Sequence, residues 1–468
     1  MRGKTNADRS PPLSRRGFLL QSAAAAVAGS AWLNASAGSG IPDKPNIVLI
    51  MTDQQTASAI SCARNAWLST PAMDMLARQG IRFDQACVTQ PLCMPSRSSL
   101  QTGRYPHEIG VTTNGRKFRG EFPMLGRLIG NAGYECAYIG KWHVGASFET
   151  AGYTGEAFDI SPDARKTEAA VTFLGRNHRT PFFLTVSYMN PHNVCELARG
   201  ESLPDGPIGA PPTDPEALPP LPENFAIPEN EPSAIRIVQR KSPYQYPTRD
   251  WDDLKWWQYL WGYYRLVEKV DAEIGNLLDA LHASPYADST IVLMVSDHGE
   301  GVAMHHWNQK QVLYDSCIRV PLILSGPGIL SGVVSTELVS TGLDIPRTLL
   351  DFAGAAAPES MRGVSLREIA EGTQSAVERS HIVAETTFAQ STTLLGLRGR
   401  MLRTRLFKYC VYDTGECREQ LFDMDADPGE TRNLAVQSVH QDTLRQLRAA
   451  MAQWAEQTKD LDFPYIRS

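Results

Sequence analysis

The stretch NIVLIMTD, residues 46–53, is a run of apolar side chains that ends at Asp53. Because the run is continuous rather than alternating, it is typical of a parallel strand that is covered on both faces. Helical patterns lie between this run and similar ones, for example at 71–79 and 263–281. The alternation predicts an α/β fold with a mostly parallel central sheet and helices on both faces. The similar runs are residues 137–139, 182–187, 291–295 and 320–324.

Polar side chains follow four of these five runs, at the point where each predicted strand ends. Ligands bind beyond the carboxyl ends of the strands in open α/β sheets. One such residue could be a strand-end cap, but four groups together predict a functional site at this edge of the sheet. The residues are Asp53, Lys141 with His143, His192, and Asp297 with His298.

Composition divides the 468 residues into three predicted parts. Residues 1–37 have the pattern of a targeting segment, and residues 38–373 form the main domain that carries the site. Within it, the proline-rich segment 202–246 lacks apolar periodicity and is interpreted as a long surface excursion. Residues 374–468 form a smaller C-terminal α+β subdomain. Its expected elements are short strands around 383 and at 394–397, 402–409 and 419–422, and a closing helix at 441–457.

The targeting segment has two arginines, Arg15 and Arg16, before a weakly apolar stretch at 17–33. It ends near a small-x-small cleavage pattern at 35–37. This arrangement resembles a bacterial twin-arginine signal peptide, which implies export machinery as a partner and a periplasmic or secreted location. The alternative is a membrane anchor, but the stretch is short and weakly apolar for a stable span. We therefore expect no stable membrane insertion of the mature protein.

The net charge and the cysteine spacing argue against nucleic-acid binding and against a structural zinc site. Residues 1–37 carry five basic residues and one acidic residue, so their removal changes the formal net charge from −6 to −10. Such a surface gives no basis for nucleic-acid binding, although a local cationic pocket can still hold an anionic substrate. None of the eight cysteines forms a CxxC pair, which argues against a structural zinc site. In an exported protein Cys410 and Cys417 could form a disulfide, and the sequence leaves this open.

The segment PLCMPSRSSLQTGR, residues 91–104, carries the chemistry. It resembles the signature of the sulfatase family, Cys-x-Pro-Ser-Arg followed by Leu-x-Thr-Gly-Arg. In that family a maturation enzyme converts the cysteine, here Cys93, to formylglycine, an aldehyde that hydrates to a gem-diol. Pro95 suits the first turn of a helix whose N–H groups and dipole favour an anion near Cys93. The alternatives are a buried structural cysteine and a plain thiolate nucleophile, neither of which calls for the rest of the motif.

The resemblance extends over nearly the whole mature chain and implies the fold of alkaline phosphatase. It also implies that residues 38–373 form a catalytic domain that hydrolyses organic sulfate esters, with a sulfated carbohydrate as the expected substrate. The alternatives are a phosphonate monoester or phosphodiester hydrolase of the same superfamily, and an inactive binding protein with this fold. The segments that carry the likeness are residues 45–55, 140–143, 191–192, 296–300, 307–310, 314–315, 319–321, 421–423, 427–430 and 433–434.

The resemblance assigns roles residue by residue. One divalent metal ion would be held by Asp53, Gln54, Asp297, His298 and the formylglycine at Cys93. The gem-diol would attack sulfur, with Arg97 and Lys141 steadying the diol and the developing charge. His192 and Lys310 would assist the leaving alcohol, and His143 would remove the remaining hydroxyl proton. We also expect either His305 or His306 to line the pocket.

Two positions depart from the commonest sulfatase pattern. Gln54 stands where many members have an aspartate, and His298 stands where many have an asparagine. An imidazole in place of an oxygen ligand shifts the preference toward manganese, iron or zinc. Calcium nevertheless remains the expected ion, with manganese as the alternative. The same pair of departures also resembles choline sulfatases and phosphonate monoester hydrolases.

Overall fold

The computed structural model describes residues 40–157, 162–374, 376–377, 379–390 and 392–465. Residues 41–468 form one compact unit. The predicted twin-arginine segment, residues 1–37, lies outside the described residues. None of the helices in the described part of the chain combines the length and the apolarity that crossing a membrane requires.

The central sheet has eight strands in the order β4-β3-β5-β1-β6-β7-β2-β8. All of its strand pairs are parallel except those of β7, which runs antiparallel to β2 and β6. The α/β prediction is therefore confirmed. The strands are β1 Asn46–Asp53, β2 Gly80–Cys87, β3 Glu135–Gly140, β4 Thr154–Ala157, β5 Phe182–Pro191, β6 Thr290–Ser296, β7 Leu322–Ser325 and β8 Val333–Ser340.

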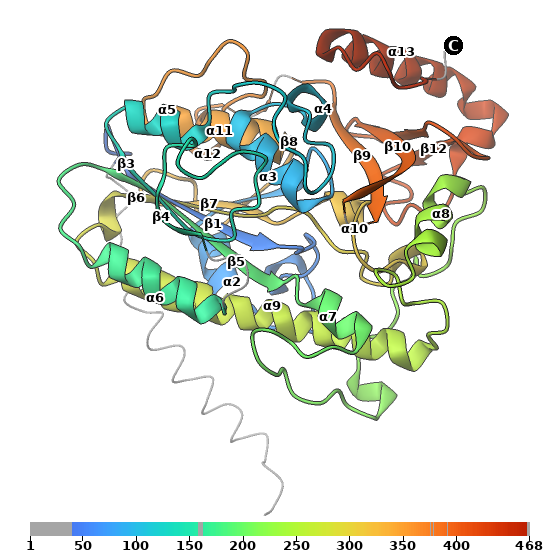
Figure 1. The fold of residues 1–468 in the computed structure, drawn as a ribbon, viewed down its shortest axis with the longest axis horizontal. Coiled ribbons are helices and arrows are strands. Elements are labelled where there is room, and N and C mark those ends of the chain that lie inside the picture. Colours follow the sequence, from blue (N-terminus) through green and yellow to red (C-terminus); the bar gives the residue numbers. More distant parts are fainter. Residues whose placement is uncertain (1–39, 158–161, 375, 378, 391, 466–468) are drawn as a thin grey trace, which may run out of the picture. The chain divides into compact units, whose positions relative to one another are not determined.

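Helices cover both faces of this sheet because its central strands are apolar on both sides. In β1, Ile47, Leu49 and Met51 join one core, whereas Val48 and Ile50 join the other. In Figure 1, α3, α5 and α11 lie above the sheet, and α2, α6 and α9 lie below it. The first group is α3 Cys93–Thr102, α5 Leu125–Asn131 and α11 Thr341–Phe352, and the second is α2 Pro71–Gln79, α6 Asp163–Leu174 and α9 Asp253–His282.

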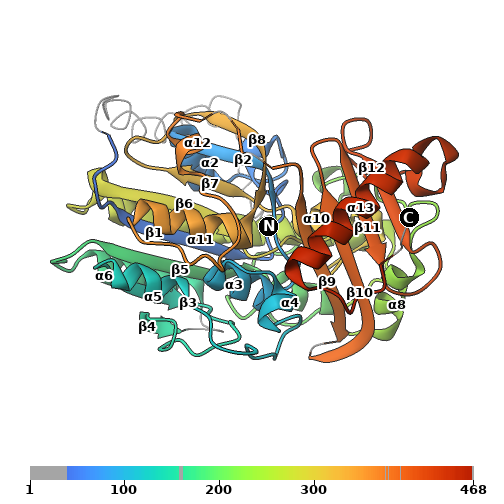
Figure 2. The ribbon, with the colours of Figure 1, turned by 90° about the horizontal axis from the view of Figure 1, so that it is seen from above.

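A second, antiparallel sheet has four strands in the order β12-β11-β10-β9. Figure 2 shows this sheet to one side of the larger one, with α13 Gln441–Thr458 beside it. It lies within the segment predicted to be a C-terminal subdomain, and the boundary at residue 373 stays a prediction. The strands are β9 Ile382–Gln390, β10 Thr393–Arg403, β11 Phe407–Tyr412 and β12 Glu419–Asp423.

Several predicted elements differ from the structure. The strands predicted at 394–397 and 402–409 have other bounds in the structure. β10 runs from 393 to 403 and therefore includes the first range and the start of the second. The chain then reverses, and β11 begins at 407. The proline-rich excursion contains a helix, α8 Ser233–Lys241, which the prediction of an irregular segment missed. This helix forms because three apolar side chains at helical spacing become buried, namely Ala234, Ile235 and Val238.

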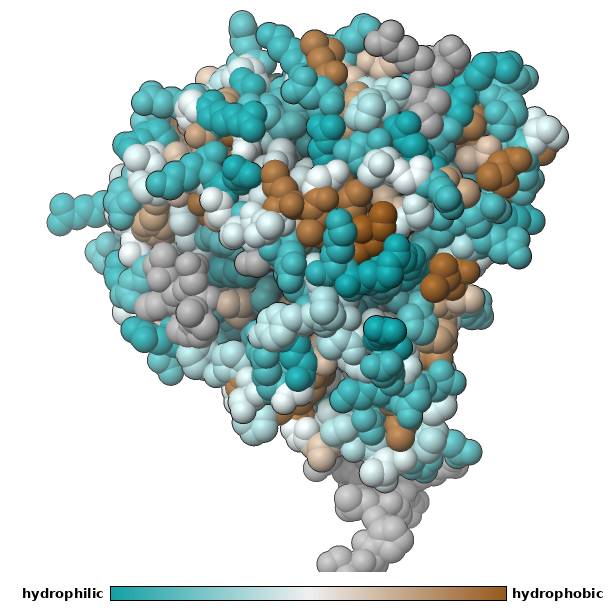
Figure 3. Space-filling view, turned by 45° about the vertical axis from the view of Figure 1, so that its right-hand side comes forward, coloured by the Kyte–Doolittle hydropathy of each residue, from teal (hydrophilic) through white to brown (hydrophobic). Residues whose placement is uncertain are grey.

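The cysteines of the chain were candidates for a disulfide. All eight cysteines are unpaired, so the Cys410–Cys417 disulfide that the sequence left open is not formed. Cys410 is buried in β11, and Cys417 is exposed in the following turn. On the face drawn in Figure 3, hydrophilic residues predominate and hydrophobic residues form small patches among them. The remaining α-helices are short: α4 Pro106–Ile109, α7 Val194–Arg199, α10 Asp315–Ile318 and α12 Arg367–Ala370.

Candidate active site

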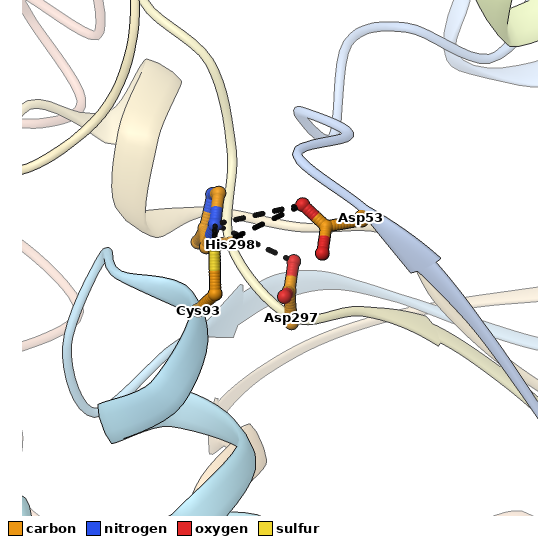
Figure 4. Close-up of side chains that lie close together, drawn as sticks. All are labelled: Asp53, Cys93, Asp297 and His298. Atoms are coloured by element: carbon orange, nitrogen blue, oxygen red, sulfur yellow. Dashed lines mark hydrogen bonds and ion pairs between the residues drawn. The ribbon is translucent and has the colours of Figure 1, made fainter. Parts of the chain in front are cut away.

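Four chemically active side chains meet at the carboxyl edge of the central sheet. Asp53 ends β1, Asp297 and His298 follow β6, and Cys93 begins α3; Figure 4 shows the four turned toward one another. The two aspartates are neighbours because Thr52 and Ser296 are paired in the parallel register of β1 and β6. One ligand atom from each of the four residues lies within 4.8 Å of the others, and all four are buried. The sequence-predicted residues of this group are therefore brought together.

Cys93 lies in a strongly cationic surrounding at the N-terminus of α3. Its Sγ is 3.1 Å from Lys310 Nζ and 3.1 Å from His298 Nε2. Burial alone would raise the pKa of this thiol, but Lys310, Lys141 and His298 hold the pKa well below its usual range. A negative charge at residue 93 is therefore stabilised, as is expected where an anionic substrate or intermediate has to be held.

Arg97 lies one turn along α3 and bridges both aspartates. Its Nε donates to Asp297 Oδ2 over 2.7 Å, and a terminal nitrogen donates to Asp53 Oδ2 over 2.9 Å. Lys141 Nζ also contacts Asp53 Oδ2, at 2.7 Å. These bonds hold the Oδ2 atoms and leave the Oδ1 atoms facing the centre of the cluster. Arg97 thus orients the acidic pair, a contact that the predicted role of steadying the diol did not include.

His298 is oriented by its own main chain. Its Nδ1 donates to the carbonyl oxygen of Gly299 over 2.9 Å, so that Nε2 points at the cluster. Nε2 lies 3.6 Å from Asp297 Oδ1 and 3.9 Å from Asp53 Oδ1. An imidazole that donates from one nitrogen and presents the other is the usual arrangement of a metal-binding histidine. Two carboxylate oxygens, this nitrogen and an atom of residue 93 fit a divalent cation.

The main-chain N–H of Gln54 donates to Asp297 Oδ1 over 3.1 Å, but its side chain has partners outside the acidic pair. Its Oε1 accepts a hydrogen bond from Lys310 Nζ over 2.7 Å, and its Nε2 donates to Glu300 over 2.5 Å. Lys310 thereby lies between Gln54 and Cys93. Glu300 was not predicted as a site residue. Its signal in the sequence was its place at the end of segment 296–300, which carries part of the family likeness.

Two further predicted residues, His143 and His192, flank Cys93. Both imidazoles interact with its side chain. His143 has a φ of 42°, a conformation that non-glycine residues rarely adopt and that is common at functional sites. Burial, together with Lys310 and Lys141, lowers the pKa of His192 to about 4.

His305 and His306 have contacts elsewhere. The ring of His305 stacks on Tyr314 at 3.9 Å between centroids, and its Nε2 donates to the carbonyl oxygen of Gly429 over 3.0 Å. The ring of His306 packs against Phe225 and Trp256. Among the described residues neither imidazole contacts Cys93 or the acidic pair, so the structure does not support the expectation that one of them lines the pocket.

This sequence matches two protein-family models and resembles named proteins over most of its length. Two family models match, described as sulfatase over residues 45–166 and 160–355, and as N-sulphoglucosamine sulphohydrolase, C-terminal, over residues 303–457. A Δ4,5-hexuronate-2-O-sulfatase of Bacteroides thetaiotaomicron is 29% identical, covering 89% of this chain and 90% of its own. An N-acetylglucosamine-6-O-sulfatase of the same organism is 26% identical, covering 90% and 88%.

Solved structures with a similar fold include a sulfatase and a phosphonate monoester hydrolase. A 2-O GAG sulfatase superposes with a TM-score of 0.82 at 28% identity, covering 91% of this chain and 95% of its own. A phosphonate monoester hydrolase of Agrobacterium radiobacter superposes with a TM-score of 0.70 at 19% identity, covering 89% and 96%, and this likeness concerns the fold alone.

Proposed function

Because the chain belongs to the sulfatase family, a family of sulfuric ester hydrolases, we propose that it removes sulfate from a sulfated carbohydrate. The observation that carries this proposal is the buried Cys93, which begins α3 between Lys141, Lys310 and a set of metal-type ligands. Relatives over most of the chain are named for sulfated hexuronate and N-acetylglucosamine, which supports a saccharide substrate.

We infer that Cys93 is converted to formylglycine, whose oxygen atoms would take the place that Sγ has in this structure. The hydrated aldehyde would supply one oxygen that attacks sulfur and displaces the alcohol, and a second hydroxyl whose deprotonation re-forms the aldehyde and expels sulfate. Asp53, Asp297, His298 and residue 93 would hold the divalent ion, with Gln54 as the fifth predicted ligand. When bound, the ion polarises the S–O bonds. Mostly oxygen donors support calcium, and the imidazole makes manganese the alternative.

The remaining side chains would act on the substrate and its protons. Lys141 and Lys310 bring two ammonium groups to the sulfate. Lys310 and His192 would face the ester oxygen that departs, where a proton or hydrogen bond lowers the barrier. His143 would accept the proton of the hydroxyl that remains on residue 93. Arg97 keeps both aspartates in place throughout.

The proposal is tested with paired substrates of one phenol, nitrophenyl sulfate and nitrophenyl phosphate, followed by a panel of sulfated saccharides. The sulfate ester should be hydrolysed faster than the phosphate ester, and at least one sulfated saccharide should be desulfated. Faster turnover of the phosphate or of a phosphonate monoester would favour the phosphonate monoester hydrolase alternative instead.

We also propose that the protein is exported through the twin-arginine route and matured by a formylglycine-generating enzyme. Arg15 and Arg16 before the apolar stretch support the route. Changing both to lysine should leave the precursor in the cytoplasm of a bacterial host, as judged by fractionation. Equal export of the double variant would exclude this route.

A further inference from the structure

A row of buried polar side chains leads away from residue 93. Lys310 Nζ lies 3.1 Å from Cys93 Sγ and donates to Gln54 Oε1 over 2.7 Å. Gln54 Nε2 donates to Glu300 Oε2 over 2.5 Å, and the hydroxyl of Tyr259 donates to Glu300 Oε1 over 2.6 Å. Both Gln54 and Glu300 are fully buried. The row therefore joins α9 to the cluster at the sheet edge without passing through solvent.

The hydrogen bonds around Glu300 have a fixed direction. Besides Gln54 and Tyr259, the main-chain N–H of Gln309 donates to Glu300 Oε1 over 2.5 Å. The main-chain N–H of Gln309 and the ammonium of Lys310 can only donate, so Glu300 Oε1 and Gln54 Oε1 have to accept. The Gln54 amide must then turn its nitrogen to Glu300 and its oxygen to Lys310. Rotated by half a turn, it would present an NH₂ group to the ammonium and repel it.

We propose that Glu300 is a positioning residue for Lys310. By fixing the orientation of the Gln54 amide, it holds the ammonium of Lys310 against residue 93, where the ester oxygen departs. Glu300 itself touches neither residue 93 nor the substrate. The inference rests on the proposed function, because it needs Lys310 to act on the sulfate ester. Gln54 Oε1 accepts from Lys310, and the thiol of Cys195 lies 3.6 Å from the same oxygen.

The first test is E300Q, which keeps the size of the side chain and changes its hydrogen-bonding pattern. An amide at position 300 has one acceptor oxygen but meets donors on both sides, from Gln54 and from Gln309. At 2.5 Å one donor must face another, so the Gln54 amide either turns over or moves. We expect kcat on a sulfated sugar to fall about 10–100-fold with KM little changed, because the acid is misplaced rather than lost. Nitrophenyl sulfate, whose leaving group needs little protonation, should lose much less.

The decisive variant is the exchange Q54E with E300Q. The amide at position 300 then donates to the carboxylate at position 54, and its oxygen accepts from Tyr259 and Gln309. The carboxylate at position 54 still accepts from Lys310, so every bond of the row is restored. The exchange should recover most of the rate on the sulfated sugar that E300Q loses. Q54E alone places two carboxylates 2.5 Å apart and should be impaired on both substrates.

Y259F is the matched control, since it removes one donor to Glu300 but leaves both donors that fix the amide. Its ratio of rates on the two substrates should stay parental. Each variant is compared at equal metal content, and the exchange variant decides the question if E300Q does not fold. A parent without sulfatase activity would overturn the proposed function. An active parent with E300Q unchanged, or with both substrates slowed equally and no recovery in the exchange, would overturn the role of Glu300.

Discussion

Cys93 is the residue on which the chemistry depends, because it is buried at a helix N-terminus between two lysines. C93A should lose all measurable turnover while keeping the melting temperature of the parent. C93S retains a single hydroxyl, so it can attack sulfur but has no second hydroxyl whose deprotonation could expel the sulfate. We expect intact-protein mass spectrometry to show a stable sulfated serine after incubation with nitrophenyl sulfate. Turnover by either variant at the parental rate would exclude the formylglycine mechanism.

Asp297 is the second decisive residue, since its two oxygens have different tasks. Oδ2 is held by Arg97, and Oδ1 faces the cluster. D297A should lose the metal and the activity together, because one carboxylate is too little to hold a divalent ion in a buried site. Elemental analysis should find about one ion per chain in the parent and almost none in the variant. An active preparation without metal would contradict the assignment. S187A, which removes a partner of Arg97 but no acidic ligand, is a suitable control.

At the level of elements, α4 is joined to both β9 and α13 through a single imidazole. His107 Nδ1 lies 2.7 Å from Glu385 Oε1, and its Nε2 lies 3.1 Å from the carbonyl oxygen of Thr458. Both partners are acceptors, so the imidazole has to be protonated to satisfy them. Although burial opposes the charge, Glu385 and, less strongly, Asp460 raise the pKa of His107 to about 9, against the opposing charge of Arg400.

The sign of the pH dependence follows from this raised pKa. The folded pKa lies above the unfolded value, so the stabilisation is fully present below about pH 6.5 and is lost as the pH rises through about 9. H107Q should therefore be less stable than the parent by on the order of 2 kcal/mol near pH 6. Urea unfolding at several pH values should show this difference shrinking toward pH 9. A difference that does not vary with pH would mean that His107 contributes by packing alone.

At the level of elements, the sequence could predict some strands of the central sheet but not others. The strands β1, β5 and β6 could be predicted because they are continuous apolar runs with polar residues at their ends. β2 could not, because it lies toward the sheet's edge and mixes Arg82, Asp84 and Gln85 with apolar residues. The strand-end residues of the site could be predicted for the same reason as the central strands. The contact between Glu300 and Gln54 could not, since these residues lie 246 positions apart in the sequence and only the fold brings them together.

At the scale of the whole molecule, a buried lysine connects the small sheet to the site. Lys408 in β11 is fully buried, and its Nζ contacts Asp315 Oδ1 at 2.8 Å and Glu430 Oε1 at 2.6 Å. Asp315 begins α10, whose next two residues, 316 and 317, accept hydrogen bonds from the main-chain N–H groups of Glu300 and Gly299. The small sheet thus supports the loop that carries Asp297 and His298. In Figure 1, α10 lies next to β9 of the small sheet.

K408M should consequently affect both stability and the site. Removing the ammonium leaves two buried carboxyl groups facing each other, and breaking such a pair typically costs about 3–5 kcal/mol. Denaturant unfolding should show a loss of this size, and the activity that remains at low temperature should be reduced because the loop after β6 loses its support. K241M removes an exposed lysine that forms no ion pair among the described residues and should change neither. Adding D315N and E430Q to K408M removes the uncompensated charges and should recover part of the stability. If K408M unfolded like the parent, the link between the two sheets would have to lie elsewhere.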